Sequence, residues 1–110
     1  MSEHYHDVGD LRFLKEMGKL AAPDFNAWLA LDNIVRREDG AIPRKYRELI
    51  ALAVAFTTQC PYCIEVHTKG AKTAGASREE VTEASMLAAA LRAGGAATHG
   101  AMALKFYDQA

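Results

Sequence analysis

Two cysteines and a histidine stand at spacings that suit thiol redox chemistry. Cys60 and Cys63 flank Pro61 and Tyr62, and His67 follows four residues after Cys63. A proline directly after Cys60 suits the first turn of a helix that has Cys60 as its N-cap. Positions three, four and seven apart share one face of a helix, so we expect both sulfurs and the imidazole to face the same side.

The start of that helix gives the thiols a reason to ionise. The unpaired backbone N–H groups of the first turn and the helix dipole favour a thiolate over a thiol. Two sulfurs one turn apart can also close a disulfide. His67 could take or return a thiol proton near neutral pH. The helix start favours ionisation of Cys60 at least as readily as that of Cys63, so this argument leaves the attacking cysteine open.

Glu48 precedes an apolar run over residues 49–56, which we interpret as a buried helix. If Glu48 packs against the helix of the cysteines, desolvation should raise its pKa toward the range of a general base. The alternative is a solvated or ion-paired carboxylate, because Arg44, Lys45 and Arg47 stand beside it. Together, Glu48, His67 and the two cysteines would supply an attacking thiolate, a resolving thiol, a proton carrier and a base.

The elements around these residues are predicted to be helical throughout. Proline and glycine positions, capping patterns and helical apolar spacing divide the chain into about six helices. Ser77 and Glu80 form a capping-box pattern, and Gly94-Gly95 is predicted to break the last helical stretch in two. We expect one domain over residues 1–110, an all-α compact bundle with its larger apolar side chains in the core or a subunit interface. The predicted helices cover residues 8–21, 23–37, 43–56, 61–74, 77–92 and 96–107, and the larger apolar side chains include Phe25, Trp28, Phe56, Met86 and Phe106.

Charge and composition argue against several classes of function. The formal net charge is −1, which gives no electrostatic footprint for nucleic acid or an anionic membrane. The longest apolar run falls far short of the ~20 residues that span a membrane. Residues 1–7 lack the pattern of a signal peptide, so we expect a cytoplasmic protein. Alanine supplies 21 of 110 residues and buries little area per side chain, so we expect a homo-oligomer to complete the core.

The spacing of Glu48, the Cys60-x-x-Cys63 pair and His67 resembles the signature of the alkylhydroperoxidase D family, part of the carboxymuconolactone decarboxylase superfamily of all-helical oligomers. The resemblance implies a peroxidase that reduces hydroperoxides, with electrons from a dithiol donor or partner reductase and no added cofactor or metal. It also implies that Cys63 attacks, that Cys60 resolves, and that Glu48 and His67 relay protons. A trimer or hexamer is the assembly that it suggests.

This chain departs from the family's better-known members at one position. They carry a histidine just before the second cysteine, where this chain has Tyr62. The tyrosine hydroxyl is a candidate replacement for that relay contact. The superfamily's decarboxylases lack the dithiol, so decarboxylation is not expected here.

Other interpretations of the cysteines stay open. The pair could act as a general dithiol–disulfide oxidoreductase, or as a redox sensor that works through a partner protein. With His67 the pair also offers three zinc ligands, which would make the chain a non-catalytic zinc module. The tetrapeptide Cys-Pro-Tyr-Cys is similar to a glutaredoxin active site, but that fold needs a sheet and this sequence shows no convincing strand.

Overall fold

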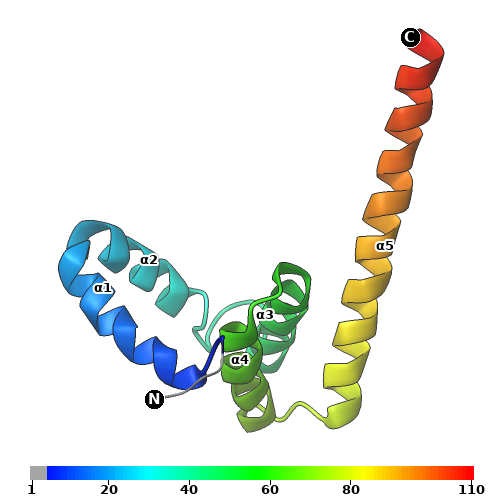
Figure 1. Ribbon diagram of the computed structural model, residues 1–110. Coiled ribbons are helices and arrows are strands. Elements are labelled where there is room, and N and C mark those ends of the chain that lie inside the picture. Colours follow the sequence, from blue (N-terminus) through cyan, green and yellow to red (C-terminus); the bar gives the residue numbers. More distant parts are fainter. Residues whose placement is uncertain (1–4) are drawn as a thin grey trace.

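The structure is a computed structural model that describes residues 5–110. Within them every regular element is helical and no strand occurs, which confirms the all-α prediction (Figure 1). Across the same residues, no helix has the length and apolar character to cross a membrane. The elements are a 3-10 helix η1 (Val8–Phe13) and the α-helices α1 (Leu14–Leu20), α2 (Ala22–Ile34), α3 (Arg44–Thr58), α4 (Pro61–Thr73) and α5 (Arg78–Gln109).

Helices α3 and α4 form a tight helical hairpin at the centre of the chain. Gln59 follows the end of α3, and its left-handed conformation (φ 57°, ψ 49°) reverses the chain at once. Cys60 then caps α4, so only two residues separate the helices. Leu52 is completely buried, and Ala55 and Ala71 are buried with it. The small alanines let the two helix backbones approach closely, which fixes how side chains along the shared face meet.

Helix α5 is one continuous helix where we predicted two. It starts at the predicted capping box, in which Ser77 and Glu80 exchange hydrogen bonds with each other's backbone N–H groups. The predicted break at Gly94-Gly95 is wrong. A glycine costs a helix about 1 kcal/mol relative to alanine but still donates and accepts every backbone hydrogen bond, so it weakens a helix without ending it.

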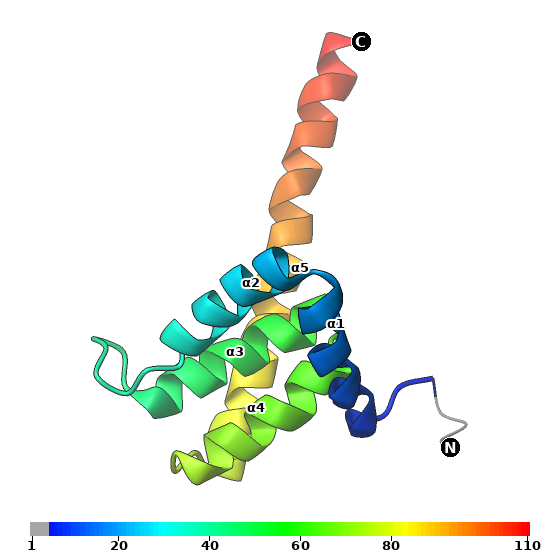
Figure 2. The same cartoon turned by 90° about the vertical axis from the view of Figure 1, so that its left-hand side faces the viewer.

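The single chain is not the compact bundle that we predicted. Its radius of gyration is 18.1 Å, against about 13 Å for a compact domain of this length. In both views the C-terminal half of α5, residues 93–109, extends beyond the other helices (Figures 1 and 2). The apolar run of α3 is only half covered, since Ile50 and Val54 are exposed, and Trp28, Met86 and Phe106 are also exposed in place of forming a core.

The N-terminal hairpin of η1, α1 and α2 joins the centre at two places. Tyr62 of α4 donates a hydrogen bond to Asp10 of η1 over 2.8 Å. At the other end, the guanidinium of Arg47 donates to the carbonyls of Ile42 (2.8 Å) and Val35 (2.9 Å). The loop thus wraps around Arg47, and a side chain at Gly40 would overlap the guanidinium.

Candidate functional site

The dithiol lies at the first turn of α4, as predicted. Cys60 is the N-cap in an extended conformation, Pro61 opens the helix, and the N–H of Cys63 donates to the sulfur of Cys60 over 3.2 Å. The two residues form a disulfide, with their Cα atoms 5.3 Å apart. Both are only partly buried. The disulfide is therefore partly accessible from solvent.

Glu48 and His67 meet across the helical hairpin. The Nδ1 of His67 lies 2.7 Å from Oε2 of Glu48. Glu48 is 3% exposed and projects from the same face of α3 as Leu52 and Ala55, four and seven residues further on. His67 follows Cys63 by one helical turn on α4, on the face that meets α3. The hairpin thus brings the carboxylate to the imidazole, which follows the dithiol by one turn of α4.

The pKa of Glu48 moves opposite to our prediction. Burial is the largest single effect and raises the pKa, as we expected. Hydrogen bonds from His67 and from Arg44, with their charges, outweigh burial and hold the pKa below its ordinary value. Glu48 is therefore an ionised acceptor at neutral pH. Glu48 is thus ion-paired with Arg44, as in the alternative interpretation, and its part in a proton relay stays a prediction.

The side chain of Tyr62 contacts the N-terminal hairpin. Its hydroxyl donates to Asp10, and this hydrogen bond is the largest cause of both the lowered pKa of Asp10 and the raised pKa of Tyr62. Its ring also stands edge-on to His6, with centroids 6.1 Å apart. The structure thus uses Tyr62 to attach the N-terminal hairpin to the turn that carries the cysteines.

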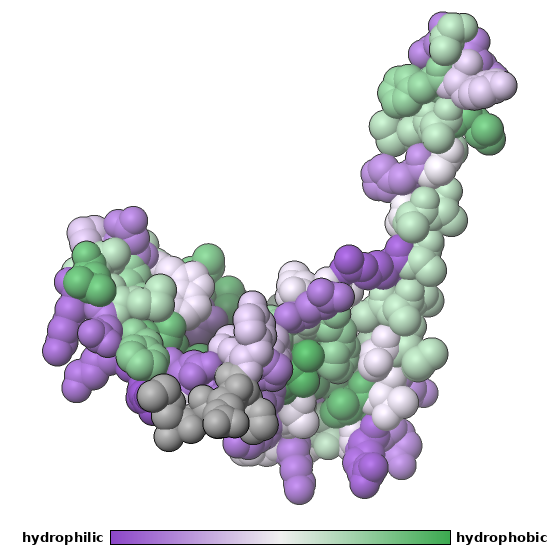
Figure 3. All heavy atoms as spheres, viewed as in Figure 1, coloured by the Kyte–Doolittle hydropathy of each residue, from purple (hydrophilic) through white to green (hydrophobic). Residues whose placement is uncertain are grey.

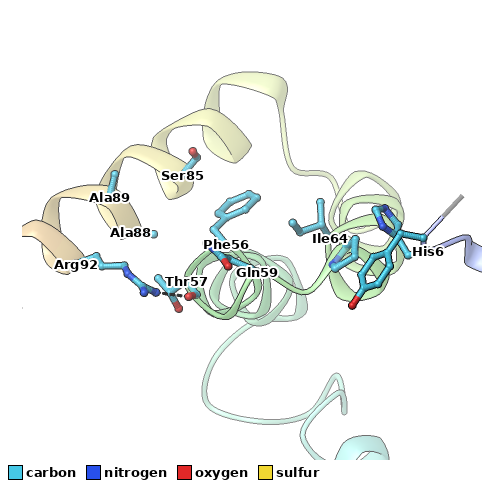
Figure 4. A pocket seen from close by; sticks show the side chains of 11 residues that line it. His6, Phe56, Thr57, Gln59, Ile64, Ser85, Ala88, Ala89 and Arg92 are labelled. Carbon is cyan, nitrogen blue, oxygen red and sulfur yellow. Dashed lines mark hydrogen bonds between the residues drawn. The ribbon is translucent and has the colours of Figure 1, made fainter.

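Two hollows adjoin the site. The smaller, about 300 Å³, has Glu48 and His67 in its wall together with Asp32, Arg36 and Arg47. The larger is an apolar groove of about 600 Å³ that reaches the turn around Cys60. Figure 4 shows this groove between the hairpin and α5. Its lining residues are Tyr5, His6, Phe56, Thr57, Gln59, Pro61, Ile64, Ser85, Ala88, Ala89 and Arg92.

Sequence reasoning named Arg44 only as one of three possible ion-pair partners of Glu48 and gave Gly70 no role. Arg44 binds Glu48 through two N–H groups, and the four-residue spacing between them on one helix is a signal that could have paired them. Gly70 of α4 lies directly against the Glu48 carboxylate. No spacing rule within one helix predicts that contact, because it joins two helices. Among the described residues, no three histidine, cysteine or acidic side chains are grouped to hold a metal ion.

Residues 25–106 match the model of the carboxymuconolactone decarboxylase family. The chain belongs to this family. That result confirms the superfamily resemblance seen in the sequence. A crystal structure of another family member, from Legionella pneumophila in its apo form, is 34% identical and superposes with a TM-score of 0.61, over 86% of this chain and 80% of that one.

Two bacterial proteins that are similar to the present chain have no characterised activity. A protein encoded in the cox locus of Paracoccus denitrificans is 45% identical over 96 residues, which covers 87% of this chain and 86% of the relative. A protein of Cupriavidus necator is 28% identical over 96 residues, covering 86% and 85% of the two chains. The family is thus established, and the reaction has to be argued from the site.

Proposed function

We propose that this protein is a thiol-dependent peroxidase of the alkylhydroperoxidase type. The observation that carries the proposal is the hydrogen bond between Glu48 and His67, one helical turn from a Cys60–Cys63 pair that forms a disulfide. A structural staple would need no imidazole held by a buried carboxylate. The arrangement supplies the two functions that peroxide reduction requires, a dithiol that takes up oxygen and a group that delivers protons.

The reaction balances with the residues present. The Cys63 thiolate attacks one peroxide oxygen, the O–O bond breaks, and Cys63 becomes a sulfenic acid. His67 takes the proton of the Cys63 thiol as the thiolate forms, and the departing alkoxide takes that proton from His67 and leaves as an alcohol. The Cys60 thiol then attacks the Cys63 sulfur, water leaves, and the disulfide forms. A dithiol donor or partner reductase returns the two electrons and two protons.

The apolar groove beside Cys60 supports an organic hydroperoxide as the substrate. Phe56 and Ile64 supply apolar surface to it from α3 and α4 (Figure 4). The groove would bury the alkyl chain of an organic hydroperoxide away from water, which is favourable. Hydrogen peroxide has no apolar part to bury, so the groove does not favour its binding. We expect a lower KM for cumene hydroperoxide than for hydrogen peroxide. Ile64→Gln should raise the KM for cumene hydroperoxide and leave that for hydrogen peroxide unchanged.

The shape of the chain supports a homo-oligomer, and we propose a trimer or hexamer. Apolar side chains lie along α5 and at its C-terminal end (Figure 3). Leu87, Leu91 and Leu104 are each about two-thirds exposed. Exposed apolar surface of this extent is typical of a subunit interface.

The test is peroxide consumption with a panel of donors, namely dihydrolipoamide, thioredoxin and glutathione. Wild type should turn over with at least one donor, and Cys63→Ser should not. In Cys60→Ser, a sulfenic acid should be trapped on Cys63. Equal rates in wild type and Cys63→Ser would reject the peroxidase. Loss of two thiols with peroxide, but no turnover with any donor, would indicate a redox sensor, and stoichiometric zinc without thiol loss would indicate the zinc module.

A further inference from the structure

The two oxygens of Glu48 are divided between two partners. Arg44 donates to Oε1 from Nε and from Nη2, each over 2.8 Å. His67 contacts only Oε2, over 2.7 Å through Nδ1. A carboxylate that is 3% exposed needs such partners, because an unpaired buried charge is strongly destabilising. The same pairing also decides which oxygen is available to the imidazole.

Arg44 stands where a cation is locally unfavourable. It is the first residue of α3, and the first turn of this helix contains no acidic residue. The helix dipole places positive partial charge at this end and disfavours Arg44, Lys45 and Arg47 there. Each of the three has a specific partner, in Glu48, Glu80 and the loop carbonyls respectively. Cations in the first turn go against the local preference of a helix. Such exceptions are expected at functional sites, where a specific partner offsets the unfavourable placement.

We propose that Arg44 is a positioning residue that fixes the tautomer of His67. With Oε1 occupied by two guanidinium N–H groups, Glu48 offers Oε2 to His67 and acts there only as an acceptor. The proton of the neutral imidazole then lies on Nδ1, and the lone pair lies on Nε2. Nε2 is the nitrogen that would exchange protons with the thiol and the peroxide, so the catalytic value of this assignment rests on the proposed peroxidase function.

The other charged groups near Glu48 do not replace Arg44. Asp32 of α2 and Arg36, in the turn after α2, line the same hollow and pair with each other over 3.3 Å. Arg47 of α3 also lines it, but its guanidinium is held by the carbonyls of Val35 and Ile42. From α4, the titratable partner at the carboxylate is His67 itself. Arg44 is therefore the arginine that binds this carboxylate directly.

The experiment is nitrogen-15 NMR of the histidine side chains in the oxidised protein, at a pH where His67 is neutral. His67→Gln assigns the resonances. Wild type should show the proton of His67 on Nδ1. Arg44→Met should convert this to a mixture of tautomers, and Arg44→Lys, which keeps the charge and one donor, should restore the wild-type tautomer in part. Lys45→Met removes the neighbouring cation, whose Nζ lies 2.9 Å from Glu80, and should leave the His67 spectrum unchanged.

A wild-type spectrum in Arg44→Met would overturn the proposal, as would an equal change in Lys45→Met. If Arg44→Met does not fold, an unchanged spectrum in Arg44→Lys and in Arg44→Gln would overturn it equally. In turnover assays, Arg44→Met should lower kcat about 10–100-fold, by analogy with the groups that orient metal-binding histidines. The tautomer readout does not depend on turnover. A wild-type protein without peroxidase activity but with the predicted spectra would reject the proposed function and keep the role of Arg44.

Discussion

The carboxylate of Glu48 lies against the backbone of Gly70, with no side chain between α3 and α4 at that point. A methyl group built on Gly70 would stand 2.8 Å from the carboxyl carbon of Glu48. This is closer than atoms of this kind normally approach. The site therefore depends on the absence of a side chain on α4, one turn after His67.

Gly70→Ala should accordingly move Glu48 away from His67. We expect a loss of about 1–3 kcal/mol in unfolding free energy, the usual cost of overpacking, together with slower thiol oxidation. In a Glu48→Ala background the same change should stabilise the protein by about 0.5–1 kcal/mol, because alanine favours a helix over glycine. Chemical denaturation of the four proteins measures this double-mutant cycle. If Gly70→Ala changes the unfolding free energy with the same sign in both backgrounds, the contact between Gly70 and Glu48 is contradicted.

Glu48→Gln should slow the oxidation of the dithiol about 100-fold near pH 7, the low end for a group in a proton relay. Glutamine can donate to Nδ1 of His67, which would place the imidazole proton on the wrong nitrogen. Stopped-flow measurement of thiol loss with peroxide checks the rate. Arg36→Met, which changes a charged neighbour that does not bind Glu48, serves as the control and should stay near the wild-type rate.

The stability advantage of wild type over Glu48→Gln should depend on pH with a definite sign. The pKa of Glu48 in the fold lies below its ordinary value of 4.5. The folded state therefore binds this proton less readily than the unfolded state, so the advantage is complete above the ordinary value. It should shrink as the pH falls through the lowered pKa. Urea unfolding at a series of pH values measures this, and an advantage that grows toward acid pH would show that the pKa is raised.

Tyr62→Phe should loosen the N-terminal hairpin while leaving the relay intact. The variant removes the hydroxyl that donates to Asp10 and keeps the ring beside His6. Limited proteolysis should then cut within η1 faster than in wild type, and Tyr107→Phe, which changes an exposed tyrosine, should not differ from wild type. Turnover should stay close to wild type, in contrast to His67→Gln. A loss equal to that of His67→Gln would return Tyr62 to the relay.

Residues 93–109 of α5 should be protected from amide exchange only in the assembled protein. Within the described residues, nothing lies within 4 Å of a side chain built at Gly94, Gly95 or Gly100. An uncovered helix with three glycines should fray in water. Hydrogen–deuterium exchange of these amides should therefore slow as the protein concentration rises, in step with sedimentation mass. Leu104→Glu should abolish this dependence, and fast exchange at every concentration in a wild-type oligomer would place the interface elsewhere.

Local rules predicted the start of α4 correctly, because capping depends on a few adjacent residues. Cys60 as N-cap and the Ser77–Glu80 box are of this kind. We did not predict that α5 continues through Gly94-Gly95. Helix propensity gives the free-energy cost of each glycine, but it does not say whether the helix ends there. The direction of the pKa shift of Glu48 was predicted wrongly, since this pKa depends on a balance between burial and two partners on different helices. Tyr62 was assigned by resemblance, and its actual partner is fifty-two residues away in sequence.

The short hairpin of α3 and α4 has a consequence for any assembly of copies. Glu48, Cys60, Cys63 and His67 all belong to one stretch of twenty residues in a single chain. Each copy therefore carries its own complete set and borrows none of the four from a neighbour. If intact chains are mixed with chains that carry Cys63→Ser, the activity of the mixed assemblies should follow the fraction of intact chains in simple proportion.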